Sequence, residues 1–274
     1  MSTISTPQPA IQTSPVWRGW HTVSLLAILV VFIAIEVLAA PSQRFSAWLI
    51  IMALLISFAL IAGHGITGHW LGLLIDSRNK VSLSRLQMVG WTIIILSAFL
   101  TAVMVNLDLR QSQPLAITVP PELWLLMGIT TTSMVGSPLI LNAKKGREAA
   151  EADKARALSA LIRQQRQQVD TARIAILGQV VVNQEPASAK LSDLFRGSET
   201  GNVGQLDVGK LQMFFFTVIL MLAYSASLAA LFRQPDPVSA LPVVDAGMLT
   251  LLGISHAGYL VHKSLPTTTA IERG

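Results

Sequence analysis

A few polar side chains stand inside long apolar stretches of the sequence, and any chemistry is expected there. Glu36, Asn106 and His256 each lie within or at the end of such a stretch. A carboxylate in an apolar helix is costly to bury and often functional, although Glu36, four residues from the end of its stretch, can also reach a nearby interface. A histidine can bond a neighbouring helix, line a pore or exchange protons near neutral pH. Asn106 can hydrogen-bond across helices.

Metal binding and catalysis have little support in the sequence. His64 and His69 are five residues apart, which places them about 140° apart around a helix rather than on one face. Ser97 with His256 is the one conceivable nucleophile and base. No G-x-S-x-G, H-E-x-x-H or P-loop motif occurs, and the absence of cysteine excludes disulfides and thiolate metal sites. We therefore expect no enzyme activity, no metal and no cofactor.

The composition shows which elements must hold these residues. Of 274 residues, 52% are hydrophobic and only 13% are charged, against about 25% charged in ordinary soluble domains. An apolar helix needs about 20 residues to cross a bilayer. The non-alternating pattern favours helices over the strands of a membrane barrel. The sequence predicts an all-α polytopic membrane bundle of about six spans, near residues 22–40, 46–63, 89–107, 122–142, 211–232 and 247–262.

The basic residues predict an orientation. With the N-terminus inside and six crossings, 17 of the 20 Lys and Arg residues lie on the cytoplasmic side, and only Arg44, Arg110 and Arg233 lie outside. Lys and Arg are concentrated in cytoplasmic loops. Both termini are therefore expected in the cytoplasm. The resulting segments are a tail (1–20), a first hairpin with an interfacial segment (21–81), one repeat unit (82–142), a cytoplasmic insertion (143–206), a second unit (207–265) and a tail (266–274).

An internal repeat at an offset of 125 residues relates the two units. Polar and glycine residues match in one ungapped register, notably Gln87 with Gln212 and Gly128 with Gly253. Both units run outward and return, which predicts parallel repeats related by an axis along the membrane normal. Matched residues at the helix starts indicate anchoring: Ser82 and Asp207 as N-caps, Arg85 and Lys210 at the level of lipid phosphate, and Trp91 as an interfacial anchor.

The cytoplasmic insertion is expected to be helical at first. Residues 144–175 are rich in strong helix formers and should continue the fourth span. A seven-residue frame places Ala155, Ile162, Val169 and Ile176 at a and Leu158, Gln165 and Ala172 at d. This face either packs on its own chain or forms a coiled coil between subunits. Residues 174–182 are expected to be a helix end and a short strand. Interleaved acidic residues and the lack of stacking aromatics argue against nucleic-acid binding.

Three segments carry a family resemblance. They are Ser82-Leu83-Ser84-Arg85-Leu86-Gln87 with Trp91-Thr92, Leu194-Phe195-Arg196-Gly197 with Leu211-Gln212-Met213-Phe214, and Leu252-Gly253-Ile254-Ser255-His256-Ala257-Gly258-Tyr259-Leu260. Together they resemble a family of bacterial multi-pass membrane proteins that has no established activity. The resemblance covers most of residues 71–265. It implies a bacterial inner-membrane location and carries over no function.

Two functions fit this organisation. The repeat, the few polar groups within spans and the coiled-coil pattern favour a homo-oligomeric channel-like or transport component in the lipid bilayer. The alternative is a membrane anchor or signalling scaffold that docks a cytoplasmic protein through residues 143–206. Polar side chains on one face of the third and fifth helices would favour the first function.

Overall fold

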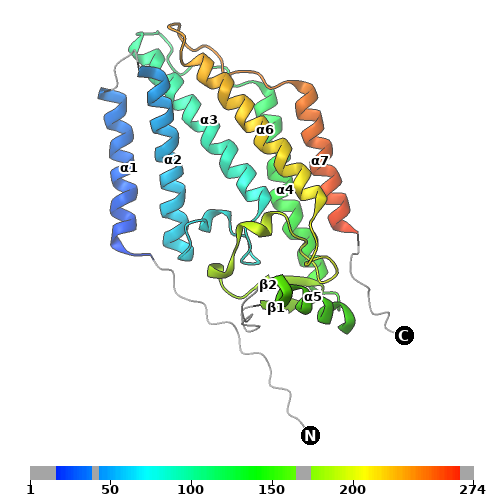
Figure 1. The fold of residues 1–274 in the computed structure, drawn as a ribbon. Helices are drawn as coiled ribbons and strands as arrows, with labels where there is room; N and C mark the ends of the chain where they lie inside the picture. The colour runs from blue at the N-terminus through cyan, green and yellow to red at the C-terminus, as the bar shows by residue number, and fades with distance from the viewer. Residues whose placement is uncertain (1–16, 39–42, 165–173, 266–274) are drawn as a thin grey trace.

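The computed structural model describes residues 17–38, 43–164 and 174–265, and it is built mainly of helices (Figure 1). The α-helices are α1 (Gly19–Leu38), α2 (Arg44–Thr67), α3 (Leu83–Asp108), α4 (Pro121–Lys145), α5 (Glu151–Gln164), α6 (Val208–Leu231) and α7 (Ala246–Ser264). Two strands, β1 (Ile174–Leu177) and β2 (Val180–Asn183), form an antiparallel hairpin. Short 3-10 helices lie at Gly72–Leu74, Pro186–Ser188 and Leu191–Leu194.

Six long helices correspond to the six predicted apolar runs. Four of them, α2, α3, α4 and α6, are long and apolar enough to cross a membrane, as expected of an integral membrane protein. The apolar stretch described in α1 (Gly19–Ile35) is shorter, and α7 carries two histidines and a lysine. The predicted membrane bundle is thus confirmed in its helical class, while the number of crossings stays a prediction.

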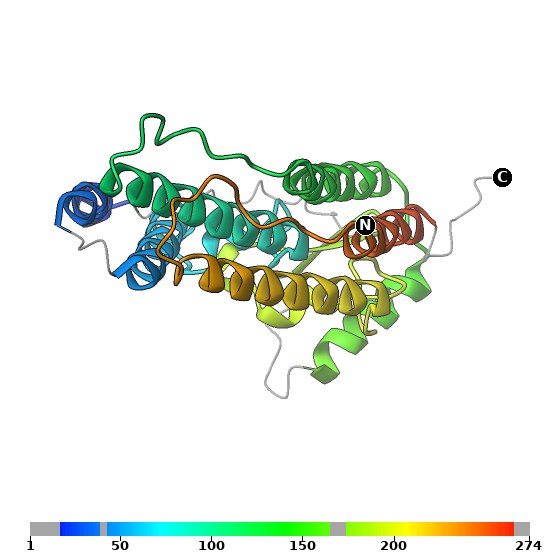
Figure 2. The same ribbon diagram turned by 90° about the horizontal axis from the view of Figure 1, so that it is seen from above.

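The bundle is wide rather than round (Figure 2). Helix α1 makes its main contacts with α2. Helix α3 packs against α2, α4 and α6, and α7 packs against α4 and α6. Half of the most apolar window of α3 is buried, against 17–28% for the other three candidate spans. Helix α3 is therefore the core helix, and the others leave broad apolar faces outward, as lipid-exposed helices do.

The two ends of the bundle differ. At the end drawn uppermost in Figure 1, here named the apical end, residues 109–120 join α3 to α4 and residues 232–245 join α6 to α7; residues 72–82 and 143–206 gather at the opposite, basal end. A continuous apolar core fills the bundle from its middle to the apical end. Its buried members include Trp48, Trp91, Ile94, Ala98, Leu126, Leu220, Tyr224 and Leu228.

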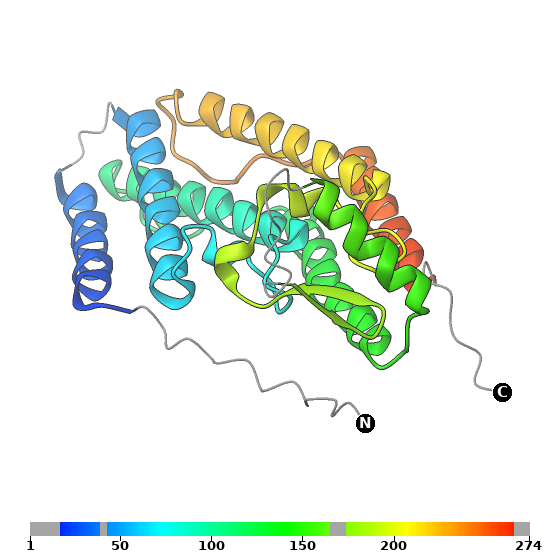
Figure 3. The ribbon, with the colours of Figure 1, turned by 60° about the horizontal axis from the view of Figure 1, so that its bottom comes forward.

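The basal segment departs from the predicted long helix. Helix α4 ends at Lys145 instead of continuing, and α5 is a separate helix that begins at Glu151. Gly178, with a φ of 57°, turns the hairpin so closely onto the end of α4 that a Cβ atom would lie 2.2 Å from the Lys145 carbonyl oxygen. Over residues 174–182 the predicted short strand is confirmed, but the predicted helix end is wrong, because residues 174–177 form the other strand of the hairpin (Figure 3).

The predicted heptad frame is only partly described. Residues 165–173, with three of its positions, lie outside the described residues, and Ile176 is in β1 rather than in a helix. Helix α5 packs on its own chain through a neighbouring stripe, in which Ala157 and Leu161 are buried against Val181 and Val203. The buried stripe therefore differs from the predicted one, whose described helical residues Ala155, Leu158 and Ile162 are exposed.

The segments that lead into α3 and α6 fold alike. Before α3, Ser82 N–H donates to the Leu74 carbonyl and Asp76 N–H to the Lys80 carbonyl. Before α6, Asp207 N–H donates to the Phe195 carbonyl and Gly197 N–H to the Gln205 carbonyl. Each segment thus has a 3-10 turn followed by a narrow antiparallel ladder that ends at the residue before the helix.

Candidate functional site

A polar network lies in the middle of the apolar bundle, and each of its four members comes from a different helix. Gln87 (α3) donates through Nε2 to Thr217 Oγ1 (α6) and lies 3.2 Å from His256 Nε2 (α7). His256 Nδ1 lies 2.6 Å from Ser133 Oγ (α4). All four side chains are buried. The network therefore joins the four helices of the two predicted repeat units at one depth.

The contacts assign a proton state to His256. The Gln87 amide nitrogen can only donate, so His256 Nε2 accepts and Nδ1–H donates to Ser133, which describes a neutral imidazole. Gln87 Oε1 is left buried without a hydrogen-bond partner among the described residues. A buried unpaired carbonyl is costly, so the network has one acceptor available for a proton donor that the described residues do not supply.

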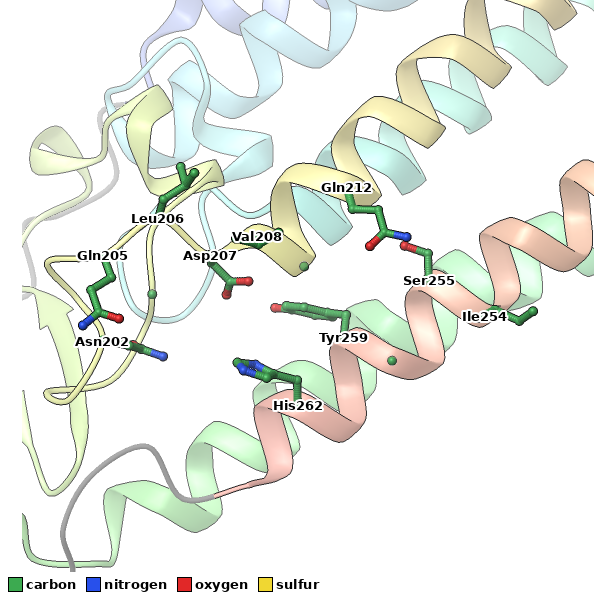
Figure 4. Close-up of a pocket in the computed structure, with 13 residues that line it drawn as sticks. Asn202, Gln205, Leu206, Asp207, Val208, Gln212, Ile254, Ser255, Tyr259 and His262 are labelled. Atoms are coloured by element: carbon green, nitrogen blue, oxygen red, sulfur yellow. The ribbon is translucent and has the colours of Figure 1, made fainter.

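A cavity opens on the basal side of this network, between α6 and α7 and the loop before α6 (Figure 4). It has a volume of about 480 Å³. Its polar lining comes from Asn202, Gln205, Asp207, Gln212, Ser255, Tyr259 and His262. Ser255 is 8% exposed, and its hydroxyl opens into the cavity and has no hydrogen-bond partner among the described residues. The deepest polar group of the cavity is thus the residue directly before His256.

Buried ammonium groups surround the basal side of this cavity. Lys263 donates to Tyr259 Oη at 2.6 Å and to Ser137 Oγ, and it lines a narrow recess that shares Asp207 and His262 with the cavity. Lys144 forms a buried salt bridge of 2.7 Å with Glu199. Every ammonium group in this set has acceptors within the protein, which is what makes its burial tolerable.

The turn before α3 holds a second charged cluster. Burial raises the pKa of Asp76, but the charge and hydrogen bonds of Arg78 outweigh it and hold the pKa below the usual 3.8. Burial and the positive charge of Arg78 lower the pKa of Lys80 to about 8. Arg78 Nη1 is buried without a hydrogen-bond partner among the described residues. Lys80 is therefore a lysine that can lose its proton close to neutral pH.

The predicted polar residues have separate places. Asn106 is buried at the apical end, where its amide donates to the Val238 carbonyl and accepts from the Val238 N–H, so it joins α3 to the loop before α7. Glu36 lies in the last turn of α1, and its side chain is outside the described part of the structure. Neither residue is near the central network. His256 is in it.

The predicted anchors also have different surroundings from those expected. Trp91 is fully buried against Tyr224 in the core, with ring centroids 5.9 Å apart. Lys210 is buried, and its ammonium donates to the carbonyl of Arg196. Arg85 contacts the Leu73 carbonyl at 3.5 Å. Trp91 is buried because α6 packs against α3. Lys210 is buried because the loop before α6 packs against the start of that helix.

The residues that match between the two predicted repeat units also have different surroundings. Gln87 is in the network, whereas Gln212 faces the cavity. Gly128 is exposed with open space around its Cα, and Gly253 packs near Ile129. Of the predicted N-caps, Asp207 accepts from Lys210 N–H at 3.1 Å, while the Ser82 side chain makes no capping bond.

The basal ends of α1 and α2 hold a histidine pair. His21 Nε2 and His64 Nδ1 are 3.0 Å apart, and His69 instead accepts from Leu71 N–H in the following turn. Trp20 stacks on His21 and Trp70 lies against His64. Among the described residues, no group of three or more metal-ligating side chains is placed to hold an ion.

The cavity was missed by sequence reasoning although a signal for it was present. Ser255, His256, Tyr259, His262 and Lys263 recur at helical spacing on one face of an apolar helix, which indicates a buried polar stripe. Asp207 was predicted only as a cap. Comparison with known proteins adds no candidate function: no protein-family model, curated protein or solved structure matches this chain.

Proposed function

We propose that this chain is a bacterial inner-membrane transport component whose solute path runs between α6 and α7 toward the Gln87–His256 network. One observation carries the proposal: a polar cavity reaches Ser255 from the basal side, while the apolar core closes the bundle above it. A transport protein that is closed toward one side of the membrane has a polar path from the other side to a binding site near the middle of the bilayer.

The orientation proposed from the basic residues agrees with the distribution of Lys and Arg between the two ends of the bundle. The basal end carries residues 143–206 and is assigned to the cytoplasm, while Arg44 and Arg233 flank the apical ends of α2 and α6. Six crossings with both termini in the cytoplasm follow if α1 and α7 span the membrane beside the four longer apolar helices. The cavity is then open to the inside.

The proposed duplication is supported by the element bounds. Helices α3 and α6 begin at Leu83 and Val208, and α4 and α7 begin at Pro121 and Ala246. Both offsets are 125 residues. The lead-in ladders match as well, with bridges Ile75–Val81 and Arg196–Leu206. Two parallel two-helix units, split by the insertion, are the simplest account.

Within this proposal the residues have defined tasks. Gln212, Ser255 and Tyr259 supply hydrogen bonds to a solute in the cavity. His256 lies at the end of the path, where a neutral imidazole can accept a proton or bond the solute. Gln87 holds His256 in its tautomer. Release to the apical side requires the core around Trp91 and Leu126 to part.

The test is flux through the purified full chain in proteoliposomes. The probes are protons, K⁺ and Cl⁻, each measured under a pH gradient and under a membrane potential. We expect flux of at least one probe in the wild type, a loss of about tenfold in His256→Ala, and no change in His69→Ala. Absence of flux for all three probes under both gradients contradicts the channel-like form of the proposal.

A second candidate is supported by a separate feature, the outer face of α5. Leu158 and Ile162 are exposed on this helix, next to the exposed Ala155. This apolar stripe suits a cytoplasmic protein partner or a second copy of the chain, as in the scaffold alternative. A chain without flux that forms a stoichiometric complex, lost in Ile162→Glu, would favour the scaffold.

A further inference from the structure

The cavity between α6 and α7 has an apolar mouth. Leu206, Val208 and Ile254 line it, and their side chains are 59%, 68% and 64% exposed. Such a set of exposed large apolar residues beside a candidate span faces lipid rather than water. The cavity is therefore open sideways to the bilayer as well as to the basal side.

The polar groups of the cavity are arranged by depth. Along α7 the lining runs from Ile254 and Ser255 through Gly258 and Tyr259 to His262, a rise of about 12 Å at 1.5 Å per residue. Asp207 and Asn202 lie at the basal end beside His262, as Figure 4 shows. This length corresponds to the glycerol and headgroup region of one lipid rather than to its acyl chains.

The lining is polar but is not a simple anion site. Asp207 contributes a carboxylate, of which one oxygen accepts from Lys210 N–H. Beside it, the first N–H groups of α6, at Val208 and Gly209, have no acceptor within the helix. His262 faces the same space. The cavity thus offers a place for a cationic group at Asp207 and, next to it, donors for an anionic oxygen.

Ser255 points independently to a ligand. The residue is more than nine-tenths buried and lines the cavity, and its hydroxyl, which opens into the cavity, has no partner among the described residues. A hydroxyl enclosed in this way is normally hydrogen-bonded. Its position, deeper than Tyr259, matches the ester oxygens of a lipid whose headgroup lies at Asp207.

We propose that this cavity binds one phospholipid with a primary ammonium headgroup, which enters sideways from the leaflet at the basal end. The ammonium donates to Asp207 and the neighbouring Asn202 and Gln205 side chains, and the phosphate lies between His262 and the start of α6. A choline headgroup has no N–H to donate, and a headgroup without a cation brings no positive charge to the carboxylate of Asp207. The inference uses the cavity of the proposed function but does not depend on transport.

The test is lipid retention by the purified full chain. The protein is equilibrated in nanodiscs with equal amounts of phosphatidylethanolamine, phosphatidylcholine and phosphatidylglycerol of matched acyl chains, then extracted, and retained lipids are counted by native mass spectrometry. We expect about tenfold enrichment of phosphatidylethanolamine over each of the others, as for one charged hydrogen-bonded contact.

Two variants remove the site in different ways. Asp207→Asn keeps a capping side chain but removes the charge, and Gly258→Leu fills a position with open space around it. Both are expected to lose the enrichment. The matched controls are Asp245→Asn, the cap at the apical start of α7, and Gly128→Leu, an exposed helix glycine with equal space; both should retain it.

The possible outcomes distinguish a bound lipid from a free solute, and lipid binding from transport. Equal retention of the three lipids, or unchanged enrichment in both site variants, overturns the inference. Displacement of the lipid by glycerophosphoethanolamine at the same concentration identifies a free solute as the ligand and overturns the lipid assignment. Lipid selectivity without flux leaves this inference standing and removes transport, whereas flux without selectivity does the reverse.

Discussion

Two glutamines at equivalent positions of the proposed repeat show how strongly surroundings decide the role of a residue. Gln87 is fully buried and bonded to Thr217 and His256, while Gln212 is exposed at the cavity. The difference arises because α3 is the core helix, whereas α6 has one face outward. A sequence match at one register therefore gives the same local helix but not the same chemistry.

Replacing these two glutamines should have unequal effects. Gln87→Leu leaves His256 Nε2 without a donor, and we expect a loss of about 1–2 kcal/mol of stability, the range for hydrogen bonds between membrane helices. Gln212→Leu removes no bond to the described residues and should leave stability unchanged. Thermal unfolding of both variants in one detergent compares them. An equal fall in the unfolding temperature of both variants would show that the central network does not contribute more to stability than the cavity surface.

Lys80 predicts a pH dependence of stability. Its pKa of about 8 in the folded chain is below the ordinary 10.5, so the folded state loses this proton first as the pH rises. Between about pH 8 and 10.5 the unfolded state binds more protons, and stability rises with pH. Lys80→Met should reduce this rise and stabilise the chain at pH 7 by up to about 3 kcal/mol.

The check is thermal unfolding from pH 7 to 10. Lys190→Met, which removes an exposed lysine, serves as the control and should keep the wild-type profile. A wild-type profile that is flat between pH 8 and 10, or the same in Lys80→Met, would contradict the assignment.

At the scale of elements, the basal segment is attached to the bundle by a few buried contacts. The Lys144 ammonium at the end of α4 bonds Glu199 and also the Leu265 carbonyl after α7. Asn79, with a φ of 54°, donates to the carbonyls of Asn183 and Gln184 and so attaches the turn before α3 to the end of β2. Contacts of this kind position the loop that forms one wall of the cavity.

Breaking the buried ion pair should loosen this segment. Glu199→Gln leaves the Lys144 ammonium buried without its carboxylate, which typically lowers stability by about 3–5 kcal/mol. We expect faster limited proteolysis within residues 143–206 and unchanged protection of α2, α3, α4, α6 and α7. The double variant Lys144→Met with Glu199→Leu should recover part of the loss, because no unpaired charge remains. Additive losses would mean that the pair is not coupled.

At the scale of the whole molecule, the assignment of the two ends to two compartments is open to direct test. The chain has no cysteine, so single introduced cysteines report without background. Ala187→Cys lies in the basal segment, and Ser112→Cys lies in the apical loop between α3 and α4.

We expect an impermeant maleimide to label Ser112→Cys in spheroplasts and Ala187→Cys only in inverted vesicles. The physical reason is the excess of Lys and Arg at the basal end, which favours the cytoplasm. Labelling of both sites from the same side would contradict a membrane-spanning bundle, and a reversed pattern would invert the proposed orientation.

The sequence by itself determined the helical class and the positions of the long helices. Apolar composition over 20 residues is a local property, and it survives in any packing because lipid and protein interiors are both apolar. The starts of α3 and α6 were likewise visible in Ser82 and Asp207. His256 was found because an ionisable group in the middle of an apolar run is conspicuous.

Only the tertiary structure decided which polar residues meet. Gln87 and His256 are 169 residues apart in the sequence, and their contact depends on how α3 and α7 are rotated about their axes. The inward positions of Trp91 and Lys210 and the turn after α4 have the same origin. The rotation and close packing of helices depend on many side chains that are far apart in the sequence, so a local sequence pattern cannot predict them.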